Sequence, residues 1–330
     1  MSRSTKILGR LGFLGCLGLL VSCAPRVATS FWRIGSPADS TRQGYAILNE
    51  GKKVRHCYPI TQWTDTPDKD TYHSLHHHGV AVESEQMAYR IYFDKKQTID
   101  PYCKRTPQLE LAQSYWYPND SLLAAGYGDD ILRVSGTVGV GSVKYYNGNK
   151  HVHIEPVAER SQRIVRQSRN KATIEVAVKQ WEVEGKKVDM SVQYTLCAGH
   201  RDMLCNINLS SPVAGLCTGV QTIPAKYPNH KSEIINLKLQ NGVLLASWGT
   251  DFPVNDTVKY AKETVGLAVF IPKQYAGDIV HDKSNQLCLL KQSTPHFYLT
   301  CVGATKETHP VATNMTEWLT YLRNWAAKLK

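Results

Sequence analysis

Hydrophobic and polar positions alternate along most of this chain, as they do in β-strands that bury one face. The clearest alternating segments are 88–93, 131–134, 172–178, 188–194, 204–209 and 264–270. Short polar turns rich in glycine, asparagine and lysine, such as 147–149 and 184–187, separate them. Parallel sheets need crossover helices, and the pattern supplies almost none. The sequence therefore predicts an all-β fold, a large antiparallel β-sandwich.

One helix is predicted, at the C-terminus from Met315. Apolar residues recur there at helical spacing: Trp318, Leu319, Leu322, Trp325, Ala326 and Leu329. Asn314 is a suitable N-cap, and Glu317 follows three residues later. We expect this stripe to pack against the sandwich; the alternative is a helix that binds a partner.

The first residues have the pattern of a secretory signal peptide. Three basic residues precede an apolar run, 11–21, that is too short to span a bilayer. The following Leu-Val-Ser-Cys ends at Cys23 and resembles the lipobox of bacterial lipoproteins. We expect removal of residues 1–22 and lipidation of Cys23; ordinary cleavage near Ala28 is the alternative.

The rest of the chain shows no repeat, low-complexity segment or linker. We expect a tether over 23–45 and a single β-sandwich domain over 46–330. No acidic cluster follows Cys23, which favours a membrane-anchored lipoprotein facing the periplasm over one on the cell surface.

The formal net charge is +11, and +8 without the three basic residues of the signal peptide. Such a surplus favours anionic partners. Nucleic acid is disfavoured by the export signal and by the lack of a dense basic helical stripe. We expect an acidic oligosaccharide as partner, together with the membrane through the lipid; a solvated basic surface without a partner is the alternative.

Seven cysteines follow the signal peptide and Cys23: Cys57, Cys103, Cys197, Cys205, Cys217, Cys288 and Cys301. An odd number cannot all pair within one chain, and no CxxC spacing indicates zinc or redox chemistry. Most should be small buried hydrophobic residues. Cys288 and Cys301 flank an expected hairpin and could pair if oxidised, which the sequence alone does not establish.

Residues 72–94 hold the densest group of reactive side chains in the sequence. They are His76, His77, His78, Glu83, Glu85, Arg90 and Tyr92. Histidine exchanges protons near neutral pH and binds metals. Side chains two apart share one face of a strand, so Arg90 and Tyr92 should project together. The group fits chemistry beside a sugar carboxylate.

For β-elimination, Arg90 would hold the uronate carboxylate, His77 or His78 would be the base, and Tyr92 the acid. For hydrolysis, the roles would pass to a carboxylate pair, with Glu83, Glu85 and Asp129 as candidates. The alternative without chemistry is a buried ion pair of Arg90 with one of the two glutamates.

Aromatic residues beside polar turns form a second candidate group. Tyr115, Trp116 and Tyr117 would stack on sugar rings, and the pair Asp129 and Asp130 would bind hydroxyls or a cation. A further loop, 248–251, offers Trp248 for stacking and Asp251 for hydroxyls. Core aromatics and an ordinary turn are the alternatives.

The segment His151-Val152-His153-Ile154-Glu155 is a third candidate. On a strand His151, His153 and Glu155 face one side, where they could ligate a divalent metal. An exposed polar face is favoured over the metal, and no other cofactor is expected.

Three blocks carry a resemblance to a known family. They read HHHGVAVESEQMAYRIYFDKKQTIDPYCK, YWYPNDSLLAAGYGDDILRVSGTVGVG and WGTDFPVNDTVKYAKETVGLAV. Over about 76–270 the chain resembles the domain-of-unknown-function 4861 family of secreted bacterial proteins, departing from it at Val80 and Cys103. The resemblance implies association with glycan degradation, often of uronate-rich polysaccharides, and a galactose mutarotase-like supersandwich. It implies no catalytic residues.

Compartment, charge and residue types together favour a carbohydrate-active lipoprotein that acts on uronate-containing oligosaccharides by β-elimination or hydrolysis. Two alternatives remain: a glycan-binding lipoprotein without turnover, which would tolerate loss of the histidines, and a mutarotase-like isomerase, which needs one histidine and one glutamate.

Overall fold

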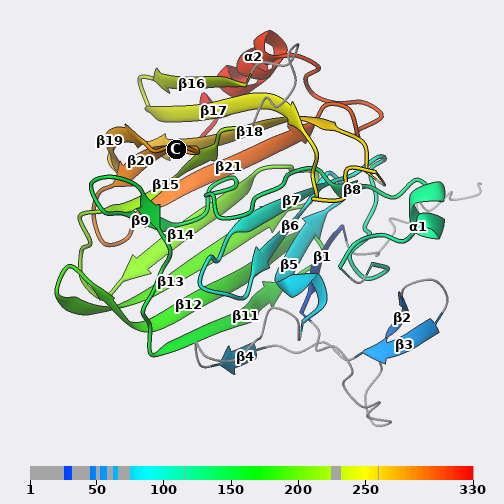
Figure 1. The fold of residues 1–330 in the computed structure, drawn as a ribbon, viewed down its shortest axis with the longest axis horizontal. Helices are drawn as coiled ribbons and strands as arrows, with labels where there is room; N and C mark the ends of the chain where they lie inside the picture. The colour runs from blue at the N-terminus through cyan, green and yellow to red at the C-terminus, as the bar shows by residue number, and fades with distance from the viewer. Residues whose placement is uncertain are drawn as a thin grey trace, which may run out of the picture.

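The computed structural model confirms the large antiparallel sandwich with a C-terminal helix (Figure 1). It describes residues 26–31, 45–49, 53–57, 62–65, 75–114, 116–223, 232–258 and 260–329. Within them, no helix is long and apolar enough to cross a membrane.

A nine-stranded antiparallel sheet is the largest element of the fold. In spatial order its strands are β16 (Glu233–Lys238), β17 (Gly242–Asp251), β18 (Glu263–Pro272), β21 (His296–Gly303), β14 (Met203–Leu209), β13 (Lys186–Cys197), β12 (Lys171–Val183), β11 (Glu159–Gln167) and β4 (Gln62–Asp65). Glu184 and Gly185 turn β12 into β13 with φ of 51° and 71°, which confirms the predicted polar turn.

Two five-stranded sheets share the other side of the sandwich. The first, the small sheet, has the order β1 (Val27–Ser30), β5 (Gly79–Ser84), β6 (Met87–Tyr92), β7 (Ile99–Cys103) and β8 (Asp129–Asp130). The second has the order β10 (His151–Val152), β9 (Lys144–Tyr146), β15 (Leu216–Gln221), β20 (Asn285–Leu290) and β19 (Ala276–His281). A separate hairpin joins β2 (Tyr45–Asn49) to β3 (Lys53–Cys57).

One hydrophobic core lies between the nine-stranded sheet and both smaller sheets. Val176 and Leu299 contribute from the large sheet, Tyr89 and Ile91 from the small sheet, and Val220 from the other. These are the inward positions of alternating strands, so the predicted binary pattern accounts for the packing.

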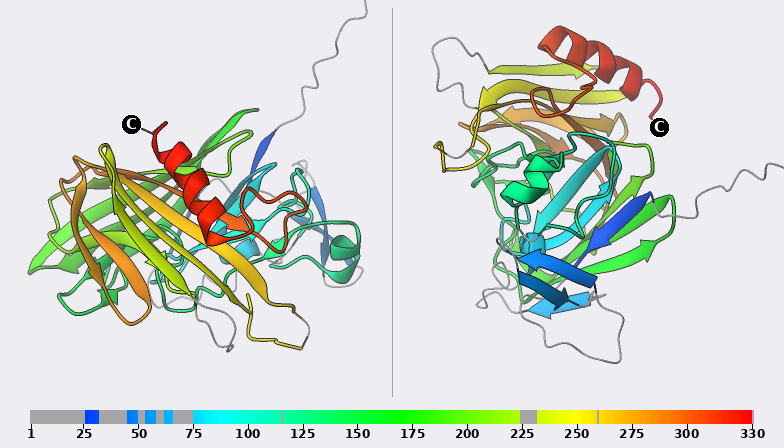
Figure 2. Two further views of the ribbon diagram at one scale, coloured as in Figure 1. Left: turned by 90° about the horizontal axis from the view of Figure 1, so that it is seen from above. Right: turned by 90° about the vertical axis from the view of Figure 1, so that its right-hand side faces the viewer.

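Helix α2 (Met315–Ala326) covers the opposite face of the large sheet over β17, β18 and β21 (Figure 2). Asn314 Oδ1 accepts the Glu317 N–H at 3.1 Å, which confirms the predicted cap. The predicted apolar stripe is the packing face. Trp318 is fully buried in it, and Gly266 provides space, since a Cβ there would lie 2.9 Å from the indole of Trp318.

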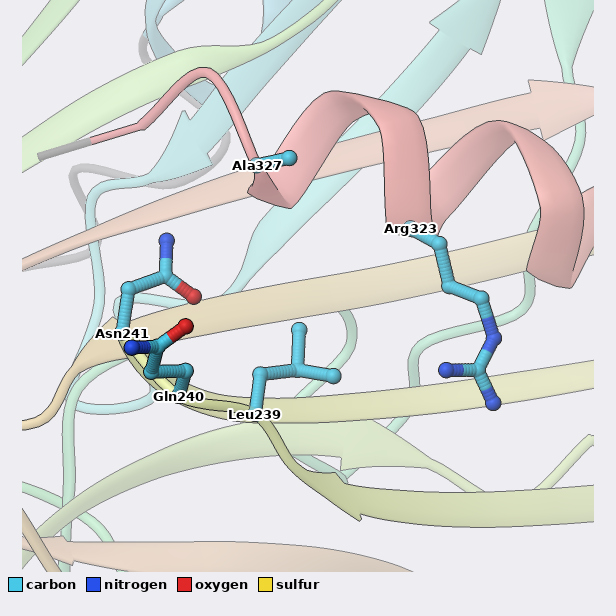
Figure 3. A pocket seen from close by; sticks show the side chains of 5 residues that line it. All are labelled: Leu239, Gln240, Asn241, Arg323 and Ala327. Carbon is cyan, nitrogen blue, oxygen red and sulfur yellow. The ribbon is translucent and has the colours of Figure 1, made fainter.

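The β16–β17 turn meets the C-terminal end of α2 (Figure 3). Asn241 Nδ2 donates to the carbonyls of Ala326 at 2.8 Å and Leu329 at 3.3 Å, so the turn satisfies carbonyls that the helix end leaves open. Beside it lies a hollow of about 520 Å³ whose lining includes one charged side chain, Arg323.

Residues 104–128 form a covering segment over the outer face of the small sheet. The segment includes α1 (Asp120–Ala124), and its contacts to the sheet come mainly from Glu110, Leu111, Trp116 and Tyr117. The reactive residues predicted on β5 and β6 lie beneath it.

Several sequence expectations are corrected by the structure. Residues 131–134 follow β8 without forming a strand, and 248–251 belong to β17 instead of a loop. The predicted tether contains β1, which pairs with β5 and buries Val27. The apolar side chains of β1 are more stable when buried beside β5 than when exposed to water, so this segment forms a strand.

The expectations for the cysteines were met only in part. Cys288 lies on β20 and Cys301 on β21, strands of different sheets, and both thiols are free. The expected hairpin is therefore not formed, because the two strands, although neighbours in sequence, pair in different sheets. Most described cysteines are buried, as predicted: Cys103, Cys205, Cys217, Cys288 and Cys301.

Candidate functional site

A buried ion pair organises the outer face of the small sheet. Arg90 on β6 lies opposite Asp100 on β7. Arg90 Nε donates to Asp100 Oδ2 at 2.8 Å, and Nη2 lies 2.7 Å from the same oxygen. Tyr92, on the same face as predicted, donates its hydroxyl to Asp100 Oδ2 at 2.6 Å and accepts from Arg90 Nη2 at 3.1 Å.

Three tyrosine rings and one carbonyl enclose the guanidinium of Arg90. Its Cζ lies 5.2, 4.6 and 4.9 Å from the ring centres of Tyr92, Tyr102 and Tyr117. Its Nη1 donates to the Trp116 carbonyl at 3.0 Å. Arg90 is 1% exposed. Arg90 therefore forms a buried ion pair, as the alternative interpretation of the sequence expected. Its partner is Asp100, however, and not one of the two glutamates that were suggested.

Asp130 is the second carboxyl of this group. Its Oδ2 lies 3.5 Å from Arg90 Nη2, farther than Asp100, and its Oδ1 accepts the Leu132 N–H at 2.9 Å. Burial and the charge of Asp100 raise the pKa of Asp130 well above its ordinary value. One arginine thus lies between two buried carboxyls, closer to Asp100 than to Asp130. We call these side chains the Arg90 cluster: Arg90, Tyr92, Asp100, Tyr102, Tyr117 and Asp130.

The three histidines form a tight turn below this cluster. His77 and His78 have φ of 53° and 58°, and Gly79 has φ of 153°. A Cβ at Gly79 would lie 2.1 Å from the Ile91 carbonyl oxygen, so glycine is required there. The sharp turn directs all three imidazoles inward, and each is at most 5% exposed.

The imidazoles of His77 and His78 contact the covering segment and help to hold it in place. His77 Nε2 lies 3.1 Å from the Leu111 carbonyl oxygen, to which it donates. Burial is the main cause that lowers the pKa of His77 well below its ordinary value, and the charge of His76 lowers it further, so His77 is neutral. His78 stacks on Trp116 with ring centres 5.0 Å apart. These contacts give His77 and His78 positioning roles.

The two glutamates lie in different environments. Glu83 is buried and accepts from Lys104 Nζ and from the backbone N–H groups of Glu110 at 2.8 Å and Leu111 at 2.9 Å. Both of its oxygens hold the covering segment. Glu85 pairs with Arg26 at 2.5 Å, outside the Arg90 cluster. The structure does not bring the two glutamates together as a catalytic pair.

Asp129 lies where β7, β8, β17, β18 and the turn after β21 meet. It pairs in register with Cys103 on β7, and a Cβ on Gly303 would lie 2.7 Å from the Cys103 sulfur. Ala304, next along that turn, donates its N–H to the Thr264 carbonyl of β18 at 2.8 Å.

Charged side chains gather at this meeting point. Glu263 lies opposite Asp251 in register. Lys306 Nζ lies 2.8 Å from Glu263 Oε1, and Arg133 Nη2 lies 2.8 Å from Asp251 Oδ2. We call the following residues the edge cluster: Asp129, Arg133, Asp251, Glu263 and Lys306.

Asp129 and Asp251, two of the three acids of the edge cluster, lie in different electrostatic environments. Burial raises the pKa of Asp129 to about 6, with a further contribution from Glu263 that Lys306 opposes. Asp251 Oδ2 accepts from Arg133, whereas its buried Oδ1 has no hydrogen-bond partner. The cluster therefore holds one carboxyl that is protonated near pH 6 and one paired carboxylate with an unengaged oxygen.

Partly exposed aromatic rings border both clusters. They belong to Trp116 and Tyr117 beside Arg90, and to Tyr260 near Asp129. Burial, followed by the charges of Asp129 and Tyr117, raises the pKa of Tyr260 to about 12. The predicted Trp116 and Tyr117 thus lie at the site, and Tyr115 lies outside the described residues.

Two other candidates lie elsewhere. Trp248 is 7% exposed and packs beneath α2, so its ring is not a stacking surface. His151 Nδ1 lies 2.5 Å from Asp282 Oδ2, and its ring centre is 6.0 Å from that of His153. In the described part of the chain no three histidine, cysteine or acidic side chains converge to hold a metal. The His151, His153 and Glu155 metal site is therefore not formed.

Sequence reasoning missed eight residues of the site: Asp100, Tyr102, Lys104, Glu110, Arg133, Tyr260, Glu263 and Lys306. One signal was available, because Asp100 and Tyr102 alternate on β7 in the same way as Arg90 and Tyr92 on β6. The others join the site through long-range sheet pairing that no local pattern indicates.

Comparisons with known proteins give the family and no activity. No curated protein matches the chain. A GH36 alpha-galactosidase, AgaB from Geobacillus stearothermophilus, is similar over 68% of this chain and 40% of its own, at 9% identity and a TM-score of 0.26. The chain thus spans less than half of that enzyme, and so low a score carries no inference about function. The family model described as domain of unknown function DUF4861 matches residues 35–330, and the chain belongs to this family.

Proposed function

We propose that this protein hydrolyses an acidic oligosaccharide at the edge cluster, with Asp129 as general acid. The observation that carries the proposal is the arrangement around Asp129. A carboxyl with a pKa of about 6 interacts with Lys306, Glu263 and Tyr260, and Glu263 lies opposite Asp251, which is ion-paired with Arg133. Glycoside hydrolysis needs an acid and a base or nucleophile on two carboxyl groups.

The two carboxyl groups suit different roles. A general acid must hold its proton near the working pH, which burial achieves for Asp129. Asp251 is ion-paired with Arg133 and has one oxygen without a hydrogen-bond partner. We assign Asp251 as the base or nucleophile. Glu263 is less suited, because Lys306 and Thr305 occupy its two oxygens.

Recognition of the sugar carboxylate falls to the cations of the edge cluster. The side chains of Arg133 and Lys306 are 24% and 16% exposed. Guanidinium and ammonium groups bind carboxylates through charge-assisted hydrogen bonds. Tyr117 and Tyr260 offer ring faces to the apolar side of a sugar.

Hydrolysis is preferred to β-elimination because the arginine assigned to elimination is already held in a buried ion pair with Asp100. Arg90, His77 and Tyr92 do lie near one another, but they are 1%, 1% and 6% exposed. Arg90 would have to leave Asp100 to hold a substrate. Breaking such a buried pair costs several kcal/mol.

The test is incubation with pectic, alginate-like and glycosaminoglycan oligosaccharides, followed by product mass and by the absorbance of unsaturated uronate. Hydrolysis adds one water per cleavage without that absorbance. Asp129→Asn should lower turnover at least 100-fold and leave oligosaccharide binding in place. Asp278→Asn, an exposed change on β19, is the matched control. Unsaturated products, or unchanged turnover in Asp129→Asn, would overturn the proposal.

A second candidate is a glycan-binding protein without turnover. The low exposure of the acids favours it, because Asp129 and Asp251 are 2% and 7% exposed. In that case oligosaccharide would bind, no product would form, and Arg133→Met would weaken binding while Asp129→Asn would not.

A further inference from the structure

Three segments meet at one end of β11, β12 and β13, beside the start of β1. The backbone N–H of Arg26 donates to the Arg169 carbonyl at 2.9 Å, in the turn between β11 and β12. The Arg26 side chain pairs with Glu85, whose Oε2 accepts the Gly199 N–H at 3.0 Å. Gly199 lies in the turn between β13 and β14.

Exposed basic side chains gather on this surface. We define the basic face as Arg26, Arg166, Arg169, Lys171 and His200, all of them exposed. The acids that face it are Glu85, which pairs with Arg26, and Asp202, which pairs with His200 at 3.0 Å. Four arginine and lysine cations against two acids leave a positive surface.

A hollow of about 440 Å³ adjoins the basic face. Gly199 and His200 line it on one side, and Asn324 and Lys328 of the C-terminal segment line it on the other. Val311, an exposed apolar residue, stands at its border. Asp202, which pairs with His200, also lines the hollow. The Lys328 ammonium and the Asn324 amide in its walls can bind the phosphate of a lipid headgroup.

The position of β1 relates this face to the proposed lipid. Arg26 is the third residue after Cys23, and three residues span at most about 11 Å. A lipid on Cys23 would thus hold Arg26 within about one Debye length of the membrane surface. Cations at that distance are attracted by anionic lipids.

We infer that the basic face docks on an anionic membrane surface, so that the domain lies directly on the bilayer. This inference rests on the proposed lipidation of Cys23, which the first measurement below tests separately. Because β1 begins at Val27, few residues separate Cys23 from the folded domain, and the predicted tether of 23–45 cannot be that long. The basic face therefore lies close to the point where a lipid on Cys23 would enter the membrane.

The experiment uses the protein purified from membranes. Its N-terminal mass shows whether Cys23 carries lipid. The protein is then incorporated into vesicles of phosphatidylcholine alone or with 30% phosphatidylglycerol, about the anionic content of many membranes, and lysines are labelled with an amine reagent. Lys171 should be labelled at least fivefold less in the anionic vesicles, and high salt should restore labelling. Lys187, at the far end of β12 and β13, should not change.

Charge reversal provides the matched comparison. Arg166→Glu with Arg169→Glu should abolish protection of Lys171, whereas Lys150→Glu with Lys273→Glu, at other exposed turns, should not. Lipid on Cys23 with equal labelling of Lys171 in both vesicles would overturn the docking face. Protection of Lys171 without lipid on Cys23 would support the face and reject the anchor.

Discussion

Arg90 on β6 and Asp100 on β7 are register partners and form a buried ion pair with Nη2 and Oδ2 2.7 Å apart. A charge in a protein interior is tolerated only when it is paired and hydrogen-bonded. Here the pair also joins the sheet to its cover, because Arg90 donates to the Trp116 carbonyl. Arg90, which the sequence suggested as a substrate-binding residue, thus has a structural role beside the edge cluster.

Removing this cation should destabilise the protein strongly. Arg90→Met leaves Asp100 buried without its partner, and we expect a loss of about 3–5 kcal/mol of unfolding free energy, measured by denaturant titration. Arg163→Met is the control, since Arg163 pairs with Glu175 with 46% of its side chain exposed and should cost less than about 1 kcal/mol. Equal losses in the two variants would contradict the role given to Arg90.

Glu83 should control the order of the covering segment. Glu83→Gln removes the charge that pairs with Lys104 and weakens two backbone contacts. We expect amide hydrogen exchange in residues 105–114 to speed at least tenfold, with the core strands unchanged. Glu85→Gln, which breaks the pair with Arg26, should leave exchange in this segment as it is. Unchanged exchange in Glu83→Gln would show that other contacts hold the cover.

The alternation along the strands predicted the fold well because burial on one face is a local property of a strand. Ile174, Val176 and Val192 all point into the core as that pattern requires. The prediction failed where an apolar run stays extended without a partner strand, as at 131–134, and where pairing reached the supposed tether at β1. Pairing over long sequence distances decides both cases.

The site was predictable only in part for the same reason. Strand register placed Arg90 beside Tyr92, and the structure confirms it. Alternation also puts Asp100 and Tyr102 on one face of their strand, but no local pattern shows that this face meets the guanidinium of Arg90, because β6 and β7 become neighbours only once the hairpin is formed. Asp129 and Lys306 lie 177 positions apart in the sequence and meet through the turn after β21.

His77 should make stability fall as the pH drops below the ordinary histidine pKa of about 6.5. Its folded-state pKa lies well below the ordinary value of about 6.5, so the unfolded chain binds the proton first. Its contribution is therefore full above that value and is lost as the pH falls. His77→Gln keeps an N–H donor for the Leu111 carbonyl and cannot take up the proton.

We expect wild type to lose stability relative to His77→Gln by up to about 1.4 kcal/mol per pH unit below pH 6.5, measured by denaturant titration. His281→Gln, an exposed change on β19, should follow wild type at every pH. Parallel curves for wild type and His77→Gln would show that the imidazole is not buried in its neutral form.

Trp318 should be the main anchor of α2. Its indole is fully buried and stacks on Tyr321 with ring centres 5.3 Å apart. Trp318→Ala leaves a large cavity and should cost about 3–5 kcal/mol. Trp318→Phe should cost less than half as much, because the indole N–H has no hydrogen-bond partner to lose. Thermal unfolding of the two variants checks the order, and a similar loss in both would reject the cavity explanation.

Asp129 should produce a pH dependence of opposite sign to that of His77. Its pKa rises from about 3.9 in the unfolded chain to about 6 in the folded protein, so the folded state binds the proton more tightly. The stabilisation is full below about pH 4 and is lost as the pH rises through 6. Since one pKa unit corresponds to about 1.4 kcal/mol, the whole effect is on the order of 3 kcal/mol.

Asp129→Asn removes this titration, because the amide stays neutral at every pH. Wild type should therefore lose stability relative to Asp129→Asn between pH 4 and 7, in denaturant titrations at closely spaced pH values. Turnover by wild type should fall over the upper part of the same range as the general acid loses its proton. A stability difference that does not change with pH would mean that Asp129 is ionised throughout, and an ionised Asp129 could not serve as the acid.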